Sequence, residues 1–338
     1  MRNPKMKAAV YHQYGSPDVV AVVDVEKPSP KDEEVLIKVH AASVNAYDLH
    51  LLRAKPFFTR FLSGLAKPRN AILGADIAGV VEVAGKSAPQ WKPGDKVYGC
   101  LESCGKGGLA TGGFAEYVCA KESVLAPIPS GAALEEAAAL PMAAVTALQA
   151  LRDKGKLRHG QRVLINGASG GVGMFAVQIA KGLGTEVTGV CSTGSVETVR
   201  SLGADHVIDY TSEDFAKNGR QYDLILDIAA NRSVKDYRRA LKPGGVCMVV
   251  GFSTIRHMLR VGLAAKRDGK KIAILAANNT RQKDLLFLNG LMETGTLKPI
   301  IDSRYPLSKA AEALWHAETK HPRGKVIIGI GCVSGKQE

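Results

Sequence analysis

The architecture of this chain follows from one stretch, Arg162-Val163-Leu164-Ile165-Asn166-Gly167-Ala168-Ser169-Gly170-Gly171-Val172-Gly173. Its apolar run predicts a buried parallel strand, its glycines a tight turn, and the residues that follow, 174–181, a helix. Such a turn gathers free backbone N–H groups and the positive end of a helix at one point, which suits a pyrophosphate. Gly170 and Gly171 let a diphosphate come close, and Gly173 lets the helix pack tightly against the strand.

The surroundings of this turn predict a mostly parallel, doubly wound sheet, because further strand candidates follow with helical stretches between most of them. These candidates are residues 186–190, 206–209, 223–228, 246–250 and 271–275. A strand before the turn, a helix after it and a second strand soon afterwards are the context that a dinucleotide-binding motif requires. The alternative is a glycine turn that only packs a helix against a strand.

The loop after the second strand bears on which dinucleotide is bound. Sites specific for NAD place an acidic residue there, whereas residues 191–195 read Cys-Ser-Thr-Gly-Ser and contain none. The hydroxyl groups of Ser192, Thr193 and Ser195 can donate to a phosphate, which favours NADP(H). Alternatively, these small polar residues form a loop and cap a helix that starts near Val196. The nearest downstream cation is Arg200.

Composition limits the remaining possibilities. The chain has 338 residues, 46% of them hydrophobic, so one large or two ordinary domains are expected. Six cysteines without regular spacing, and an N-terminus without an apolar signal segment, favour a cytoplasmic protein. A net charge of +13 favours anionic partners such as a phosphorylated cofactor or a membrane surface. No motif for specific nucleic-acid binding is present.

The rest of the chain predicts a second domain. Residues 6–126 read as short β segments with Pro and Gly between them, which is typical of an antiparallel or partly barrel-like domain. A helical stretch, 134–151, is interrupted by Pro141. The tail carries a helix near 307–317 and a strand at 325–328, and we expect it to return to the first domain. The predicted division is 1–126 with 297–338, and 127–296.

These features together resemble the medium-chain dehydrogenase/reductase superfamily over nearly the whole chain. The residues that carry the resemblance, besides the glycine turn, are Lys7-Ala8-Ala9-Val10, 73–81 (LGADIAGVV), 92–97 (KPGDKV), 113–117 (GFAEY), 202–210 (LGADHVIDY) and 323–327 (RGKVI). Within the superfamily the chain is similar to the zinc-free quinone oxidoreductase-like branch, including reticulon-interacting protein-type NADPH reductases. The resemblance implies an α/β protein with a GroES-like, partly open β-barrel catalytic domain and a doubly wound Rossmann domain. It also implies NADPH and a homodimer, for which the strand at 271–275 is the expected edge.

The zinc ligands of the superfamily's alcohol dehydrogenases are missing from the sequence. Their Cys and His positions correspond to Asn45 and Ala75, so no catalytic zinc site of His and Cys can form there. Cys100, Cys104 and Cys119 do not make up the four-Cys structural lobe. We therefore predict no metal.

An enzyme without a metal needs an acceptor that is already electron-poor. Quinones and α,β-unsaturated carbonyls fit, since charge develops on a conjugated oxygen and one or two hydrogen-bond donors suffice. The predicted function is therefore NADPH-dependent reduction of such acceptors. Two alternatives remain open: an NADPH-binding regulatory or interaction protein with little turnover, and an NAD(P)-dependent alcohol dehydrogenase with zinc.

Candidate catalytic residues lie in the segment 43–53. The resemblance places Asn45 beside the nicotinamide, and Tyr47 or His50 is the candidate that hydrogen-bonds the substrate oxygen or supplies a proton. The alternative for Tyr47 and His50 is packing in the pocket wall. The predicted cofactor-binding residues, partly from the turn and partly from the resemblance, are Asn45, Thr146, Ala168, Ser169, Gly170, Gly171, Val172, Gly173, Ser192, Thr193, Tyr210, Gly251, Phe252, Arg323 and Lys325.

Two stretches, 53–69 and 255–267, mix cations with apolar and aromatic residues. Each is open to three interpretations: a mobile lid over an apolar substrate, a peripheral contact with an anionic membrane, or ordinary helices with an apolar face in the core and solvated charge outside.

Overall fold

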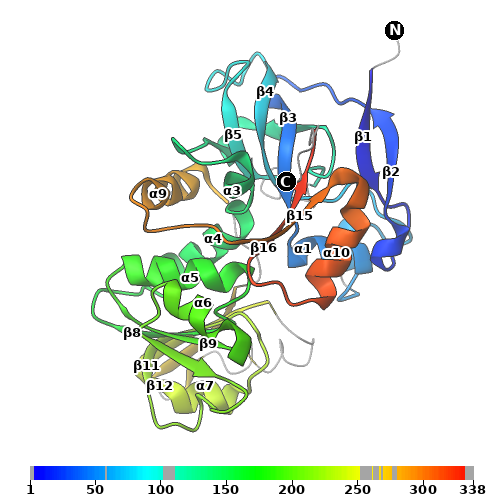
Figure 1. The fold of residues 1–338 in the computed structure, drawn as a ribbon. Coiled ribbons are helices and arrows are strands. Elements are labelled where there is room, and N and C mark those ends of the chain that lie inside the picture. The colour runs from blue at the N-terminus through cyan, green and yellow to red at the C-terminus, as the bar shows by residue number, and fades with distance from the viewer. Residues whose placement is uncertain are drawn as a thin grey trace, which may run out of the picture. The chain divides into compact units, whose positions relative to one another are not determined.

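A computed structural model describes residues 4–57, 59–101, 111–251, 261, 266–267, 269–275 and 280–331 (Figure 1). The chain divides into two compact units. Unit 1 comprises Met1–Met142, Asn279–Glu293 and Pro299–Glu338, and unit 2 comprises Ala143–Asn278 and Thr294–Lys298. Among the described residues, no helix is long and apolar enough to cross a membrane.

Unit 2 contains the predicted sheet. Its strands run in the order β10 (His206–Asp209), β9 (Glu186–Cys191), β8 (Arg162–Asn166), β11 (Tyr222–Asp227), β12 (Leu241–Val250), β14 (Lys270–Leu275) and β13 (Lys266–Arg267). All neighbours pair in parallel except β13, which is antiparallel to β14. The predicted doubly wound architecture is therefore confirmed.

The order in which strands are added to this sheet reverses between β8 and β11. Strands β9 and β10 extend the sheet on one side, and β12 and β14 extend it on the other. Ligands of doubly wound folds bind at the carboxyl ends of the strands at such a reversal. The helices are α5 (Gly171–Gly182), α6 (Val196–Ser201) and α7 (Val234–Ala240), with short 3-10 turns at Thr193–Ser195. Eight consecutive residues of α5, from Gly173 to Ala180, are buried, which explains its apolar sequence.

Unit 1 is built on antiparallel strands. Its main sheet has the order β15 (Ile301–Pro306), β16 (Lys325–Gly329), β3 (Glu34–Ser43), β4 (Asp76–Ala84), β5 (Lys96–Cys100) and β7 (Leu125–Pro127), with β6 (Tyr117–Lys121) also on β3. A separate pair joins β1 (Lys5–Val10) and β2 (Ala21–Glu26). The helices are α1 (Ala46–Arg53), α2 (Thr59–Ser63), α3 (Leu134–Ala138), α9 (Gln282–Glu293) and α10 (Ala310–Thr319), with 3-10 turns at Pro17–Val19, Glu122–Val124 and Leu307–Lys309.

The tail returns to unit 1, as the sequence predicted. Strand β16 pairs in parallel with β15 and antiparallel with β3, so residues about 280 positions apart become neighbours, for example Ile327 opposite Ser43. Figure 1 shows the tail in red and orange among the blue strands of the same unit. This pairing brings Lys325 next to the end of β3.

The division into units differs from the predicted boundaries, because 127–142 and α9 pack with unit 1. The buried Tyr98 hydroxyl lies 2.6 Å from Asn289 Oδ1 and 3.1 Å from the Leu285 carbonyl, which ties α9 to β5. Pro141 begins a new helix, α4 (Pro141–Leu148), which continues as a π-helical segment over Gln149–Lys154. Proline suits the first turn of a helix because its missing N–H has no acceptor there.

The predicted edge strand at 271–275 is not the outermost strand. β13 pairs with its first residues, Lys266 opposite Lys271 and Arg267 opposite Lys270, and so takes the edge at that end.

Candidate functional site

The glycine turn at the end of β8 has the close packing that the sequence predicted. Gly167 adopts φ 89°, a left-handed conformation that favours glycine. A Cβ added to Gly173 would lie 2.0 Å from the Gly167 carbonyl oxygen, so no larger side chain fits at that position. By contrast, a Cβ on Gly170 would meet nothing closer than 3.7 Å. The turn is therefore tight on its protein side and open at Gly170.

The amino end of α5 is left without a cap. Gly170 is the N-cap residue, and in the described part of the chain no side chain accepts a hydrogen bond there. The N–H groups of Gly171, Val172 and Gly173 in the first helical turn have no acceptor within the helix. Ser169 and Gly170 are half-buried, whereas Ala168 is buried. These open N–H groups and the helix dipole fit a pyrophosphate.

The loop after β9 contains the hydroxyl groups that the sequence assigned to a phosphate. Ser192 is half-buried and Thr193 is exposed, whereas Ser195 is buried and is not available to a ligand. Thr193 Oγ1 lies 3.1 Å from Thr211 Oγ1, which donates to Asp209 Oδ1 at 2.8 Å. Hydrogen bonds from Thr193, the largest influence, and from Thr211 hold the pKa of the half-buried Asp209 below its usual value. The loop is thus tied to the end of β10.

Other predicted cofactor residues of unit 2 lie at or near the carboxyl ends of strands. Tyr210 follows β10 and its side chain is 55% exposed, so it is accessible to a ligand. Gly251 follows β12 and adopts φ 77°. Thr146 lies within α4 and is 8% exposed. Phe252 lies outside the described residues.

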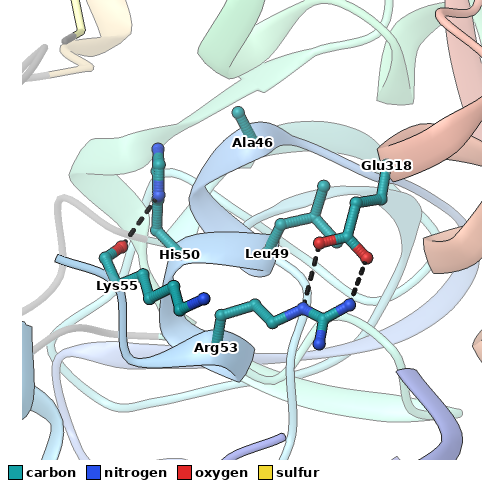
Figure 2. A pocket seen from close by; sticks show the side chains of 6 residues that line it. All are labelled: Ala46, Leu49, His50, Arg53, Lys55 and Glu318. Carbon is teal, nitrogen blue, oxygen red and sulfur yellow. Dashed lines mark hydrogen bonds and ion pairs between the residues drawn. The ribbon is translucent and has the colours of Figure 1, made fainter. Parts of the chain in front are cut away.

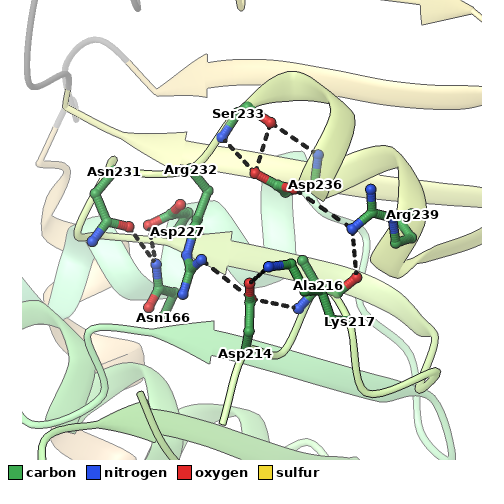
Figure 3. A network of polar contacts seen from close by, with 10 residues as sticks. All are labelled: Asn166, Asp214, Ala216, Lys217, Asp227, Asn231, Arg232, Ser233, Asp236 and Arg239. Atoms are coloured by element: carbon green, nitrogen blue, oxygen red, sulfur yellow. Dashed lines mark hydrogen bonds and ion pairs between the residues drawn. The ribbon is translucent and has the colours of Figure 1, made fainter. Parts of the chain in front are cut away.

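A buried polar network at the reversal of strand order was not predicted from the sequence (Figure 3). Asp227, at the end of β11, is fully buried. It accepts hydrogen bonds from Asn166 Nδ2 at 2.9 Å, the Ala230 N–H at 2.8 Å and the Tyr237 hydroxyl at 2.7 Å. Asn166, at the end of β8, also donates to Asn231 Oδ1 at 3.2 Å. The network fixes the loop after β11 beside the strand that leads into the glycine turn.

Residues next to this network fix the two ends of the loop after β11, as Figure 3 shows in part. Arg232 forms an ion pair with Asp214 at 3.1 Å and lies 5.0 Å from the centre of the Phe215 ring. Ser233 caps α7, since its Oγ accepts from the Asp236 N–H at 3.2 Å. The loop after β11 is therefore anchored at both of its ends.

Unit 1 contains a buried ammonium group beside Asn45. Lys325 is 3% exposed, and its Nζ donates to Asn45 Oδ1 at 2.5 Å and to the Val44 carbonyl at 3.2 Å. Burial lowers the pKa of Lys325, and the neighbouring carboxylates Asp76 and Asp48 oppose that effect. Lys325 reaches this position because its strand, β16, pairs directly with β3.

Two fully buried carboxyl groups balance this ammonium. Asp76 accepts from Ser43 Oγ at 3.1 Å, from Asn45 Nδ2 at 3.0 Å and from the Met142 N–H at 3.0 Å. Burial raises the pKa of Asp76, and Lys325 is the largest influence that lowers it again. Burial raises the pKa of Asp48 to about 7, although it accepts hydrogen bonds from two backbone N–H groups, those of Asn45 and Gly74.

The Asn45 amide is held by contacts within unit 1. Its Nδ2 donates to Asp76 and to the Ser43 carbonyl at 3.2 Å, and its Oδ1 accepts from Lys325, so the amide is fully engaged within unit 1. The same contacts show that an ammonium, not a set of thiolate and imidazole ligands, lies at this position. That donor set does not fit zinc. No cluster of three or more His, Cys, Asp or Glu suited to a metal occurs among the described residues.

A pocket of about 520 Å³ lies along the outer side of α1 (Figure 2). Its lining residues are Ala46, Leu49, His50, Arg53, Lys55 and Glu318. His50 Nδ1 lies 2.9 Å from the Lys55 carbonyl, which leaves Nε2 as the ring nitrogen available to a ligand. Arg53 donates to both carboxylate oxygens of Glu318, at 2.9 and 2.6 Å, which closes one wall of the pocket.

The remaining predicted residues of unit 1 lie apart from one another. Tyr47 is half-buried and packs against the core of the unit, and it is not among the residues that line the pocket. The Arg323 side chain is exposed, and its backbone N–H donates to Asp302 Oδ1 at 2.8 Å. The structure thus brings together Asn45 and Lys325 in unit 1, and the glycine turn in unit 2 lies on the same sheet edge as the loops after β9 and β10.

Comparison with known protein families matches two regions of the chain. Residues 31–130 match the alcohol dehydrogenase GroES-like domain, and residues 202–328 match the zinc-binding dehydrogenase family. The second match does not include the positions 45 and 75 at which the zinc ligands would lie.

Complete proteins of known activity are similar along almost the whole chain. The chain is 33% identical to a 2-methylene-furan-3-one reductase of Solanum lycopersicum, over 96% of this chain and 79% of the relative. It is 32% identical to an NADPH-dependent alkenal/one oxidoreductase of Arabidopsis thaliana, with the same coverage of 96% and 79%. Among solved structures, a quinone oxidoreductase of Coxiella burnetii superposes with a TM-score of 0.85 at 30% identity, covering 97% of this chain and 100% of that one.

Proposed function

Since the chain belongs to the medium-chain dehydrogenase/reductase superfamily, in its quinone oxidoreductase branch, we propose that it is an NADPH-dependent reductase of quinones or α,β-unsaturated carbonyls. The observation that carries the proposal is the ammonium of Lys325 beside Asn45, where alcohol dehydrogenases of this superfamily hold zinc. Without a metal to form an alkoxide, the acceptors that fit are those already polarised by conjugation.

The cofactor is assigned to the sheet edge of unit 2. Bound NADPH supplies the hydride, and the protein supplies binding and orientation. The first-turn N–H groups of α5 are the pyrophosphate donors, and the 2′-phosphate is assigned to the hydroxyl groups of Ser192 and Thr193. The open, left-handed Gly251 and the exposed Tyr210 ring are further contacts. The resemblance adds Thr146, Phe252 and Arg323 to this proposal.

Lys325 is proposed to act through Asn45, because its ammonium is enclosed by protein. The charge fixes the amide of Asn45 in one orientation, and Asn45 in turn holds the start of α1 through its backbone N–H bond to Asp48. The donor to the developing negative oxygen of the acceptor is assigned to His50, whose Nε2 is available in the pocket beside α1.

A screen of NADPH oxidation tests the proposal. The purified protein is mixed with NADPH and a panel of quinones, enals and enones, and then with NADH in place of NADPH. We expect turnover of at least one acceptor class with a preference for NADPH. Tight NADPH binding without turnover of any acceptor would overturn the assignment as a reductase and identify a binding protein instead.

A substitution in the loop after β9 tests the preference for NADPH over NADH. Ser192→Asp places a carboxylate where the 2′-phosphate is assigned, so we expect kcat/KM for NADPH relative to NADH to fall by about tenfold or more. Ser201→Asp adds the same charge at the other end of α6 and serves as the control, because its side chain is exposed. An equal change in both variants would refute the assignment of the loop after β9.

The homodimer is a separate proposal. The edge formed by β13 and the outer side of β14 is its assigned interface, since an unpaired edge extends readily across a two-fold axis. Light scattering after gel filtration tests it, and a monomer at micromolar concentration would refute it.

A further inference from the structure

The segment that connects α1 to β4 carries exposed apolar side chains that have no role in the proposed reaction. Phe57, Phe61 and Leu65, called the aromatic patch below, are 64%, 62% and 61% exposed. No other large hydrophobic side chain among the described residues is as exposed as these three. They recur every fourth residue around α2, and the rings of Phe57 and Phe61 pack edge to face with centres 6.1 Å apart. An apolar cluster that faces water needs an explanation.

Hydrogen bonds fix the segment that carries the aromatic patch to the rest of unit 1. The Tyr14 hydroxyl donates to the Gly64 carbonyl at 2.6 Å and lies 2.9 Å from Ser63 Oγ. Ser63 Oγ is also 2.9 Å from the Thr59 carbonyl, and the Arg69 N–H donates to the Ser63 carbonyl at 2.7 Å. The polar groups of this segment are therefore bonded to unit 1. The apolar side chains are left on the outer side.

The segment that carries the aromatic patch contains several cations and no acid. The sequence has no Asp or Glu between Asp48 and Asp76. Lys55, Lys67 and Arg69 are exposed, and none of them pairs with a carboxylate in the part of the chain that the structure describes. Lys55 also lines the pocket in Figure 2, where no hydrogen bond or ion pair is drawn to its ammonium.

The Arg60 guanidinium lies 4.9 Å from the centre of the Tyr14 ring and 5.6 Å from that of Phe57. It therefore covers the base of the aromatic patch with positive charge. The segment 55–69 therefore combines exposed apolar side chains with cations that no acid within it offsets.

We propose that the aromatic patch docks on an anionic lipid bilayer. Aromatic side chains favour the boundary between headgroups and acyl chains, and flanking Lys and Arg side chains reach anionic headgroups at the same depth. The short span of the patch fits a shallow insertion better than a protein interface, which commonly needs about 800 Å² on each partner. The net charge of +13 adds a longer-range attraction to the same surface. The inference does not depend on the proposed reductase activity.

Co-sedimentation with vesicles tests this inference on the full chain. One set of vesicles is phosphatidylcholine alone, and the other contains phosphatidylserine as well. We expect binding to the anionic vesicles at low ionic strength and weaker binding at physiological ionic strength, because salt screens the cations. Binding that is equal on both vesicle types, or absent from both, overturns the proposal.

Two variants separate the apolar and the charged contributions. Phe57→Ser/Phe61→Ser is expected to weaken binding about tenfold or more, because both anchors are lost. Lys67→Gln/Arg69→Gln is expected to weaken it roughly fivefold for each cation removed. Leu286→Ser removes another exposed apolar side chain, 47% exposed on α9, and is expected to bind as the wild type does.

The thermal unfolding midpoint of each variant checks that the fold is intact. If the patch variants keep the midpoint and still bind the vesicles as the wild type does, another surface is responsible and the proposal is wrong. If instead the chain binds an immobilised acidic peptide but not the anionic vesicles, the patch is a protein-binding surface.

Discussion

Removal of the buried ammonium, by Lys325→Met, is the sharpest perturbation that the structure offers. Methionine fills a similar volume, so the change isolates the charge and its two hydrogen bonds, to Asn45 Oδ1 and the Val44 carbonyl. The buried carboxyl group of Asp76 loses its largest source of stabilisation by charge. Lys325 and Asp76 are linked through the Asn45 amide, and leaving a buried carboxylate without its compensating charge costs about 3–5 kcal/mol.

The loss should depend on pH in a direction that the structure sets. Burial already raises the pKa of Asp76 above its value in the unfolded chain, and the loss of Lys325 raises it further. A carboxyl group of this kind destabilises the fold progressively as pH rises from its unfolded pKa to its folded pKa, and fully above that. Lys325→Met should therefore cost less stability at pH 5 than at pH 8, because a protonated Asp76 needs no compensating charge.

Urea unfolding at both pH values, followed by tryptophan fluorescence, measures this effect. Asp76→Asn in the same chain removes the unpaired charge, and the double variant should regain a large part of the loss above pH 8. Lys320→Met changes an exposed lysine and should stay within about 0.5 kcal/mol of the wild type. A loss in Lys325→Met below about 1 kcal/mol, or no recovery in the double variant, would refute the reasoning.

Three further variants test the packing of the glycine turn and one buried hydrogen bond. Gly173→Ala places a Cβ 2.0 Å from the Gly167 carbonyl, so we expect a lower melting temperature and at least about tenfold weaker NADPH binding by fluorescence titration. Gly290→Ala, where a Cβ meets nothing within 4 Å, should be neutral or stabilising by up to about 1 kcal/mol, and an equal loss in both variants would contradict the packing argument. Tyr98→Phe leaves the buried Asn289 Oδ1 without the hydroxyl at 2.6 Å and should lower the free energy of unfolding by about 1–3 kcal/mol, measured in urea, whereas no change would show that water replaces the hydroxyl.

The parts of the fold that the sequence predicted depend on local patterns. The strand, turn and helix at 162–182 and the strand at 186–191 are each specified by consecutive residues, and the structure has them there. The predicted interruption of the helical stretch 134–151 at Pro141 is also present, since α3 ends at Ala138 and α4 begins at Pro141.

The parts that the sequence did not predict depend on distant partners. The contact of the Asn45 amide with Lys325, 280 residues away, is one such feature. The Asp227 network likewise joins the ends of strands 61 residues apart. No spacing in the sequence identifies such pairs, because sheet order alone brings them together. An unexplained Lys in an otherwise apolar strand, as at 325–328, is the signal that a buried partner exists.

The place of β16 in the sheet of unit 1 has a consequence for how the protein is made. Strand β3 leaves the ribosome early and cannot complete its sheet until β16 follows, nearly 300 residues later. The strands of unit 2 are all synthesised in between, as one uninterrupted segment. The nucleotide-binding unit can therefore fold on the nascent chain while the other unit is still waiting for its last strand. The Lys325 ammonium beside Asn45 is brought in by that last strand, so this position of the site is among the last to be assembled.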